Sequence, residues 1–292
     1  MKRCKGRGIA LMLVLMFGLG MTAPMTAGAG DQDDYFSVLL LGTDEGAHES
    51  IVESETEYGR SDAMMLLSLH KQSGALRMLS LERDYRTDIL NDGPTKLCIV
   101  CLKAGPEKSL EAVNQLLGLN IRHYALIDPP GMEAVANALG GIDLEIREDE
   151  LWITRDSGGK AFKRAGMQHL DGRQVRAYVR RRDTAIEDSD LIRNEQQVAA
   201  LTALIKKALD AGQLGLLEFA QVAMKHVKTN IGLTEILTLA EPLLGGGHFD
   251  VEFAKSPLTE AKLQTVNLHR MQVLIDPATE VERVGAFLYS GK

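Results

Sequence analysis

Short apolar runs alternate with longer segments of helical periodicity along most of this 292-residue chain. The runs have the length and flanking residues of buried strands, whereas the longer segments repeat apolar residues every three or four positions. Such alternation predicts an α/β fold with layers around one sheet. The expected strands are 36–41, 63–69, 75–81, 123–127, 142–146, 251–254 and 272–275. The expected helices are 106–117, 129–139, 190–211, 216–224, 234–244 and one after Asp276-Pro277.

Residues 1–34 have the composition of an export leader followed by a short acidic spacer. A basic start precedes the apolar stretch 9–20, and Ala27-Gly28-Ala29 resembles a signal-peptidase site. A membrane-spanning helix needs about 20 apolar residues, and Pro24 interrupts the end of this one. A cleaved signal peptide is therefore slightly favoured over a signal anchor. Both place residues 35–292 outside the cytoplasm as one domain, with the membrane as a partner at the N-terminus.

Composition and charge narrow the class of partner. The chain is 45% hydrophobic with a net charge of -7, which is ordinary for a globular protein and argues against non-specific nucleic-acid binding. Cys98 and Cys101 have C-x-x-C spacing, which fits either a local disulfide or two reduced core cysteines in one helical turn. No second pair of cysteines or histidines lies near them, so a zinc site is not expected.

Arginines cluster in the second half of the chain. Between positions 173 and 182 they are Arg173, Arg176, Arg180, Arg181 and Arg182. If 179–182 is extended, Arg180 and Arg182 point to the same side. A helix capped by Asp190 would then place Arg193 in its first turn, on one face with Gln197. Such a set suits a di- or polyphosphate; the alternative is a solvated basic face.

Aspartates stand at the ends of neighbouring predicted strands. Asp44 follows the first strand, Asp62 precedes the second, and Arg83-Asp84 leaves the third. Strand ends in α/β sheets are common places for sites, and two carboxylates could hold a hard cation that shares phosphate oxygens. Each aspartate alone is better explained as a turn or cap residue, but the aspartate pair and the arginines together suit a metal pyrophosphate. The motifs G-x-S-x-G, H-E-x-x-H and the P-loop are absent from the sequence.

Several short motifs occur in a specific order. They are LLLGTD at 39–44, GRSDA at 59–63, LSLERD at 79–84, KL at 96–97, AGPE at 104–107, ALGGID at 138–143, LDG at 170–172, YVRRR at 178–182, and Asp190 to Arg193 with Gln197. Each is weak alone, but in this order and after such a leader they are specific. From about residue 36 to about residue 209, the chain resembles the LytR–CpsA–Psr family of bacterial cell-wall enzymes.

The resemblance implies a three-layer α-β-α fold with a central mixed sheet. It also implies a Mg²⁺-dependent phosphotransferase that moves an anionic glycopolymer, such as teichoic acid or capsular polysaccharide, from an undecaprenyl-pyrophosphate carrier to peptidoglycan. Carried over residue by residue, the metal ligands are Asp44 and Asp62. The pyrophosphate-binding residues are Arg60, Arg83, Lys96, Arg180, Arg182, Arg193 and Gln197. The catalytic residues are Arg83, Asp84, Arg180 and Arg193, with Asp84 or a metal-bound carboxylate taking the proton of the acceptor hydroxyl.

The chain departs from the family pattern at a few positions. Glu82 stands where proline usually precedes the Arg-Asp pair, and Gln196 replaces a second helix arginine. Cys98 and Cys101 replace an asparagine and an aromatic residue. Two alternatives are hydrolysis of polyprenyl pyrophosphate and a non-catalytic wall- or lipid-binding regulator of the transcriptional-attenuator type. The first two departures are the only features of the sequence that point toward them.

A lipid-linked substrate requires a long apolar cavity with a charged mouth. The segments 63–69, 132–139 and 216–224 are rich in Met, Leu and Val. We expect them to line such a cavity, with its opening at Arg83, Arg180 and Arg193, and we expect Arg173 to be a surface residue. The alternative for each segment is an ordinary core.

Overall fold

The computed structural model describes residues 32–44, 57–153, 161–162, 164–180, 189–244, 251–258, 263–266 and 270–290. The predicted leader and Arg182 lie outside these residues. None of the helices in the described ranges combines the length and the apolar character needed to cross a bilayer.

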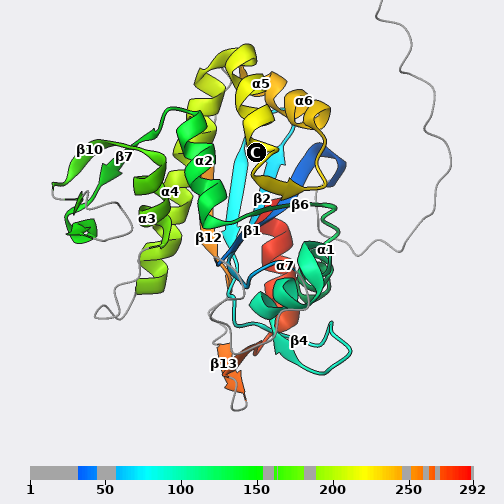
Figure 1. The fold of residues 1–292 in the computed structure, drawn as a ribbon. Helices are drawn as coiled ribbons and strands as arrows, with labels where there is room; N and C mark the ends of the chain where they lie inside the picture. Colours follow the sequence, from blue (N-terminus) through cyan, green and yellow to red (C-terminus); the bar gives the residue numbers. More distant parts are fainter. Residues whose placement is uncertain are drawn as a thin grey trace, which may run out of the picture.

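A mixed six-stranded sheet forms the centre of the molecule, in the order β11-β6-β1-β2-β3-β12 (Figure 1). Its strands are β1 (Tyr35–Thr43), β2 (Ser61–His70), β3 (Leu76–Ser80), β6 (His123–Ile127), β11 (Val227–Thr229) and β12 (Val251–Lys255). β1 is antiparallel to β2 and parallel to β6, while β3 is antiparallel to β2 and parallel to β12. The predicted α/β fold with a central mixed sheet is confirmed.

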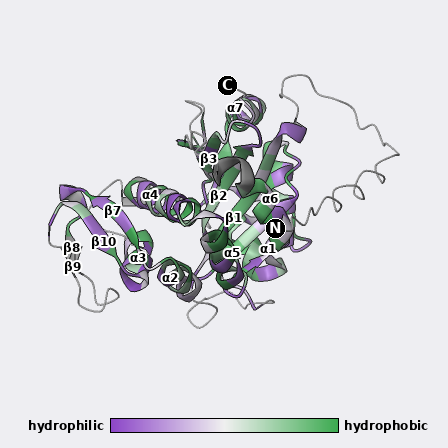
Figure 2. Cartoon of the chain, turned by 90° about the horizontal axis from the view of Figure 1, so that it is seen from above, coloured by the Kyte–Doolittle hydropathy of each residue, from purple (hydrophilic) through white to green (hydrophobic). Residues whose placement is uncertain are grey.

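Helices cover both faces of this sheet. α1 (Leu97–Leu117) and α7 (Pro277–Leu288) pack on one face, where Leu39, Leu66 and Val284 share one buried cluster. On the other face, Leu40 and Leu67 pack with Leu201 of α4 (Ser189–Asp210). Because side chains alternate along a strand, β1 and β2 are apolar toward both layers. Seen from above, α4 lies beside the sheet with α2 (Pro129–Ala138) next to it (Figure 2).

The layer that contains α4 is completed by three more helices. α2 contacts α3 (Gly172–Arg180) and α5 (Gly212–Ala223), and α5 contacts α6 (Leu233–Leu244). α5 and α6 cover the end of α4 that lies at the top of Figure 1. The helices predicted for 129–139, 216–224 and 234–244 are thereby confirmed.

Smaller ribbons extend from this core. β7 (Ile142–Ile146) pairs antiparallel with β10 (Gly166–Leu170) beside α3, so the strand predicted at 142–146 exists but belongs to a separate ribbon. The remaining short elements are η1 (Gln32–Asp34), β4 (Arg86–Thr87), β5 (Thr95–Lys96), η3 (Glu148–Glu150), β8 (Trp152–Ile153), β9 (Ala161–Phe162), β13 (Leu263–Val266) and β14 (Met271–Leu274).

Helix boundaries follow local signals, with two corrections. Asp128 caps α2 by accepting the N–H of Gly131 at 2.7 Å, and Asp276 caps α7 by accepting that of Thr279 at 3.2 Å. α1 joins two helical segments across Gly105, whose φ of 85° is not helical; the second segment begins at Pro106 as predicted, and the first, 97–104, was not expected. The expectation of an extended segment at 179–182 is also wrong for residues 179 and 180, which close α3.

Candidate functional site

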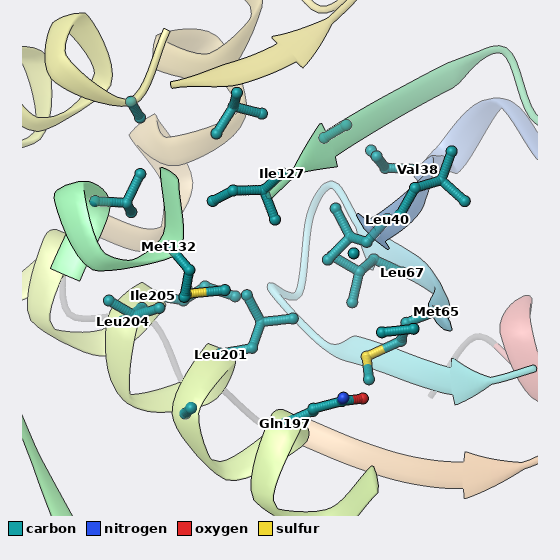
Figure 3. A pocket seen from close by; sticks show the side chains of 18 of the residues that line it. Val38, Leu40, Met65, Leu67, Ile127, Met132, Gln197, Leu201, Leu204 and Ile205 are labelled. Atoms are coloured by element: carbon teal, nitrogen blue, oxygen red, sulfur yellow. The ribbon is translucent and has the colours of Figure 1, made fainter. Parts of the chain in front are cut away.

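An apolar cavity of about 710 Å³ lies between the sheet and the layer formed by α2, α4, α5 and α6. Figure 3 shows Leu40 and Leu67 of the sheet across from Leu201 of α4, with Met132 of α2 closing one side. All three segments predicted to line it do so, through Met65, Val135 and Phe219 among others. A volume in this range is ordinary for a ligand site, and here the wall is almost wholly aliphatic. The predicted apolar cavity is confirmed.

The polar lining of the cavity gathers the predicted residues from opposite parts of the fold. It comprises Thr43, Asp44, Asp62, Asp128, Arg176, Arg180, Arg193 and Gln197. We call this set the cavity mouth. The two aspartates come from the ends of β1 and β2, whereas the arginines come from α3 and α4. The fold therefore brings acidic and basic groups that lie more than a hundred residues apart to one opening.

A β-bulge places the aspartates. Gly42 pairs with Ala63 but Thr43 pairs with Ser61, so Asp62 is the extra residue between two regular pairs. Bulges redirect a side chain at the end of a ladder, and this one lets Asp62 line the same cavity as Asp44. Both aspartates thus face one cavity, as their proposed shared cation requires.

Asp44 is held by the segment just before β2. Both of its carboxylate oxygens accept bonds from Arg60, Oδ1 from the main-chain N–H at 2.9 Å and Oδ2 from Nε at 3.1 Å. Its own N–H donates to the carbonyl of Arg60 at 3.1 Å. A Cβ on Gly59 would lie only 2.1 Å from Asp44 Oδ1, so only glycine allows the carboxylate to sit here.

Asp62 is held by Arg83. The guanidinium donates from Nη1 to Asp62 Oδ1 at 2.8 Å, and both side chains are a little over a quarter exposed. Burial lowers the pKa of Arg83, but the carboxylates of Asp62 and Asp84 outweigh it and the pKa rises above its ordinary value. Arg83 does not itself line the cavity. The prediction that the cavity opens at Arg83 is therefore corrected: Asp62 stands in between.

Asp84 and Lys96 form a further pair behind Arg83. Lys96 Nζ lies 2.9 Å from Asp84 Oδ1, and Arg83 Nε lies 3.9 Å from the same oxygen. The first contact is an ion pair whose angle falls outside that of a hydrogen bond. Neither Asp84 nor Lys96 lines the cavity, and Arg60 does not either. These predicted site residues therefore contact the aspartates or one another and not the cavity itself.

The arginines of α3 and α4 lie on the helical side of the mouth. Arg193 is 7% exposed, and Arg180 is an exposed residue at the end of α3. Gln197 donates from Nε2 to the carbonyl of Val179 at 3.2 Å and so ties α4 to α3. α4 begins at Ser189, one residue before the predicted cap Asp190, so Arg193 lies just past the first turn. Arg173 is exposed, as expected.

Arg176 is a mouth residue that the sequence did not single out. It lies one helical turn before Arg180, and its Nη1 is 3.1 Å from Glu133 Oε2 of α2. Its Nε is buried without a hydrogen bond. The i, i+4 spacing of Arg176 and Arg180 was visible, but it places both on one face only if the segment is helical.

Glu82 and Gln196, two positions that depart from the family pattern, have different surroundings. Glu82 accepts the N–H of Asp84 at 3.2 Å, so it shapes the turn that carries the Arg-Asp pair. Gln196 is fully buried, and neither atom of its amide has a hydrogen-bond partner. It does not line the cavity.

Cys98 and Cys101 are buried near the start of α1 and form no disulfide. Desolvation by burial raises the pKa of each thiol to about 12. The N–H of Cys98 donates to the carbonyl of Arg83 at 3.0 Å. Of the two alternatives left by their spacing, the structure has the reduced core cysteines, which support the strand ends of the site.

The mouth offers oxygen ligands for a cation but not a complete set. Within the described part of the chain, no three His, Cys, Asp or Glu side chains form a group able to hold a metal. A pair of carboxylates fits Mg²⁺, which keeps several waters and shares phosphate oxygens. The donor set therefore suits a hard cation that arrives with a phosphorylated ligand and does not suit a closed structural metal.

A family model matches residues 21–281 and is that of the LytR_cpsA_psr family. The chain belongs to this family. It is 27% identical over 263 residues to the polyisoprenyl-teichoic acid–peptidoglycan teichoic acid transferase TagV of Bacillus subtilis strain 168, covering 85% of this chain and 62% of that protein. It is 30% identical over 209 residues to TagT of the same organism, a transferase described in the same words, covering 70% of this chain and 63% of that protein. The chain thus spans less than two thirds of the length of these curated relatives.

Solved structures of family members share the fold. The crystal structure of Bacillus subtilis TagV matches with a TM-score of 0.70 at 24% identity, over 89% of this chain and 98% of that one. The family protein YwtF (TagT) with bound octaprenyl pyrophosphate lipid matches with a TM-score of 0.64 at 22% identity, over 91% and 95%. The LytR–CpsA–Psr fold expected from the sequence motifs is confirmed.

Proposed function

We propose that this protein is a Mg²⁺-dependent phosphotransferase that moves an anionic glycopolymer from an undecaprenyl-pyrophosphate carrier to peptidoglycan, outside the cytoplasmic membrane. One observation carries the proposal: a long aliphatic cavity has a mouth that combines Asp44 and Asp62 with Arg180 and Arg193. An isoprenoid tail matches the cavity wall and a pyrophosphate matches the mouth. The relatives named as teichoic acid transferases and the relative with octaprenyl pyrophosphate support the same assignment.

The cavity would bind the donor by its tail. Burying apolar surface contributes about 25 cal/mol per Å², and the facing walls of Leu40, Leu67 and Leu201 supply that surface. The tail would then fix where the pyrophosphate lies, because the arginines of the polar lining come only from α3 and α4, across from Asp44 and Asp62. Binding energy from the non-reacting tail would thus position the reacting phosphorus.

The mouth would stabilise the charge that develops during transfer. Asp44 and Asp62 would hold Mg²⁺, which when bound neutralises phosphate oxygens and stabilises the leaving phosphate. Arg180 and Arg193 would donate charge-assisted hydrogen bonds to the remaining oxygens. A sugar hydroxyl of peptidoglycan would attack the phosphorus that bears the glycopolymer, and polyprenyl phosphate would leave.

The acceptor hydroxyl must lose its proton as it attacks. Asp84 or a metal-bound carboxylate was predicted for this step, but the carboxylate of Asp84 is paired with Lys96 and lies outside the cavity lining. Asp62 lines the cavity and would be the metal-bound carboxylate of that prediction. In this proposal Asp84 orients Arg83 and Lys96, and Asp62 accepts the proton.

The test is turnover of a lipid-pyrophosphate-linked glycopolymer by the full chain with Mg²⁺ and peptidoglycan. A charge-assisted hydrogen bond is worth about 1.5–3 kcal/mol, so Arg180→Ala and Arg193→Ala should each lower turnover about tenfold to a hundredfold. Arg173→Ala is the matched control, because it removes an exposed arginine from the same helix as Arg180.

The products separate the proposal from its rivals. Glycopolymer phosphate linked to peptidoglycan supports the transferase. Glycopolymer phosphate released into water, whether or not peptidoglycan is present, would make the protein a hydrolase. Lipid binding without either product would favour a regulatory protein, and equal effects of all three arginine variants would reduce the cluster to a basic surface.

A further inference from the structure

Two ion pairs lie at the cavity mouth, Asp44–Arg60 and Asp62–Arg83. Arg60 donates to both carboxylate oxygens of Asp44, at 2.9 and 3.1 Å, and Arg83 donates to Asp62 at 2.8 Å. These two aspartates are the oxygen ligands that suit a cation, and the two arginines have the geometry that suits phosphate. In the ligand-free protein Asp44 and Asp62 are therefore each already engaged by an arginine.

This pairing opposes the binding of a cation by itself. Mg²⁺ requires near-octahedral oxygen ligands at about 2.0–2.1 Å, and a guanidinium on the same carboxylate both occupies lone pairs and repels the ion. The pairing also opposes the binding of a phosphate by itself, because Arg60 and Arg83 must leave a carboxylate before they can bind the phosphate. A cation alone would leave the displaced arginine without a partner, and a phosphate alone would leave the aspartate without one.

Resting on the function proposed above, we infer that the site is loaded by an exchange of partners. Each arginine that moves from its aspartate to a phosphate oxygen frees a carboxylate oxygen for the cation. The cation and the diphosphate therefore bind with positive coupling, and each raises the affinity of the other by the same factor. Because there are two exchangeable pairs, a diphosphate can engage both, whereas a monophosphate engages one.

The exchange distinguishes substrate from product. The proposed donor carries two phosphates and the leaving lipid carries one. After transfer, one arginine returns to its aspartate and competes with the cation again. The ion pairs Asp44–Arg60 and Asp62–Arg83 thus act as a built-in discrimination against polyprenyl monophosphate, which favours release of the product.

The first arm of the test measures Mn²⁺ binding to the full chain without any lipid, by electron paramagnetic resonance of the free ion. Arg83→Gln and Arg60→Gln should each bind Mn²⁺ about tenfold more tightly than the unaltered protein. Arg86→Gln is the matched control, because it breaks another arginine–aspartate pair, Arg86–Asp88, that does not line the cavity. Its effect should be at most about threefold. Circular dichroism melting confirms that each variant is folded.

The second arm repeats the Mn²⁺ titration with geranylgeranyl pyrophosphate, geranylgeranyl monophosphate or geranylgeraniol, after subtraction of the ion bound by each lipid alone. The unaltered protein should bind Mn²⁺ at least tenfold more tightly with the diphosphate than with the monophosphate, and that ratio should shrink in Arg83→Gln. Arg60 and Arg83 variants that bind Mn²⁺ no more tightly than Arg86→Gln, with lipid binding intact, would overturn the exchange alone. A failure of the unaltered protein to bind the prenyl pyrophosphate would overturn the proposed function as well.

Discussion

Gly59→Ala tests whether the geometry at Asp44 is as tight as described. The added Cβ would lie 2.1 Å from Asp44 Oδ1 and 2.8 Å from its carbonyl oxygen, both well inside van der Waals contact. Asp44 must therefore shift and lose the bond that it accepts from the N–H of Arg60. Forcing extra volume into a packed site costs about 1–3 kcal/mol. Each kcal/mol corresponds to at most about 2–4 °C in the melting temperature of a chain of this size.

The matched control is Gly232→Ala, because a Cβ there would meet nothing within 4 Å. An open surface position should change the free energy of unfolding by no more than about 0.5 kcal/mol. Urea unfolding of both variants gives the stability, and turnover at several Mg²⁺ concentrations gives the function. We expect Gly59→Ala to be less stable and to need more Mg²⁺. If it matches Gly232→Ala in both measurements, the placement of Asp44 is wrong.

Two further predictions concern the cavity and the buried thiols. Leu201→Trp fills the cavity between α4 and β2 and should weaken binding of a prenyl pyrophosphate about tenfold to a hundredfold. The control Leu214→Trp, at a position 79% exposed on α5, should leave the affinity unchanged. Equal affinities of the two variants would place the lipid elsewhere. Burial raises the pKa of Cys98 and Cys101 to about 12, so the thiolate is scarce at neutral pH and maleimide should label the peptide with both cysteines only after unfolding. Rapid labelling of the folded protein at pH 7.5 would contradict the burial. Because the folded pKa of these thiols lies above the ordinary value, the stability that they contribute is complete below about pH 9. This stability should be lost as the pH rises toward 12.

The sheet and its covering helices were predictable because their sequence signals are local. The apolar runs at β1, β2 and β3 are bounded by turn residues, and Lys71 to Gly74 forms the turn between β2 and β3. The first half of α1 was missed because Pro106 is a strong start signal, whereas its kink depends on Gly105 adopting a positive φ. α3 was misjudged because five arginines in ten residues obscure the apolar face formed by Val175 and Tyr178.

The site was predictable in its residues but not in its contacts. The order of motifs identified Asp44, Asp62, Arg180 and Arg193, all of which line one cavity. The bulge at Asp62 could not be predicted, because it depends on the register of two strands brought together by tertiary packing. The pairing of each aspartate with an arginine likewise depends on distances that only the folded chain sets.

The most direct test of the central claim is a crystal structure of the full chain grown with Mg²⁺ and a long-chain prenyl pyrophosphate. The tail should lie between the sheet and α4, against Leu67 and Leu201, with the phosphates at Arg180 and Arg193 and the cation between Asp44 and Asp62. A saturating ligand bound at another surface, with the aliphatic cavity empty, would contradict the account.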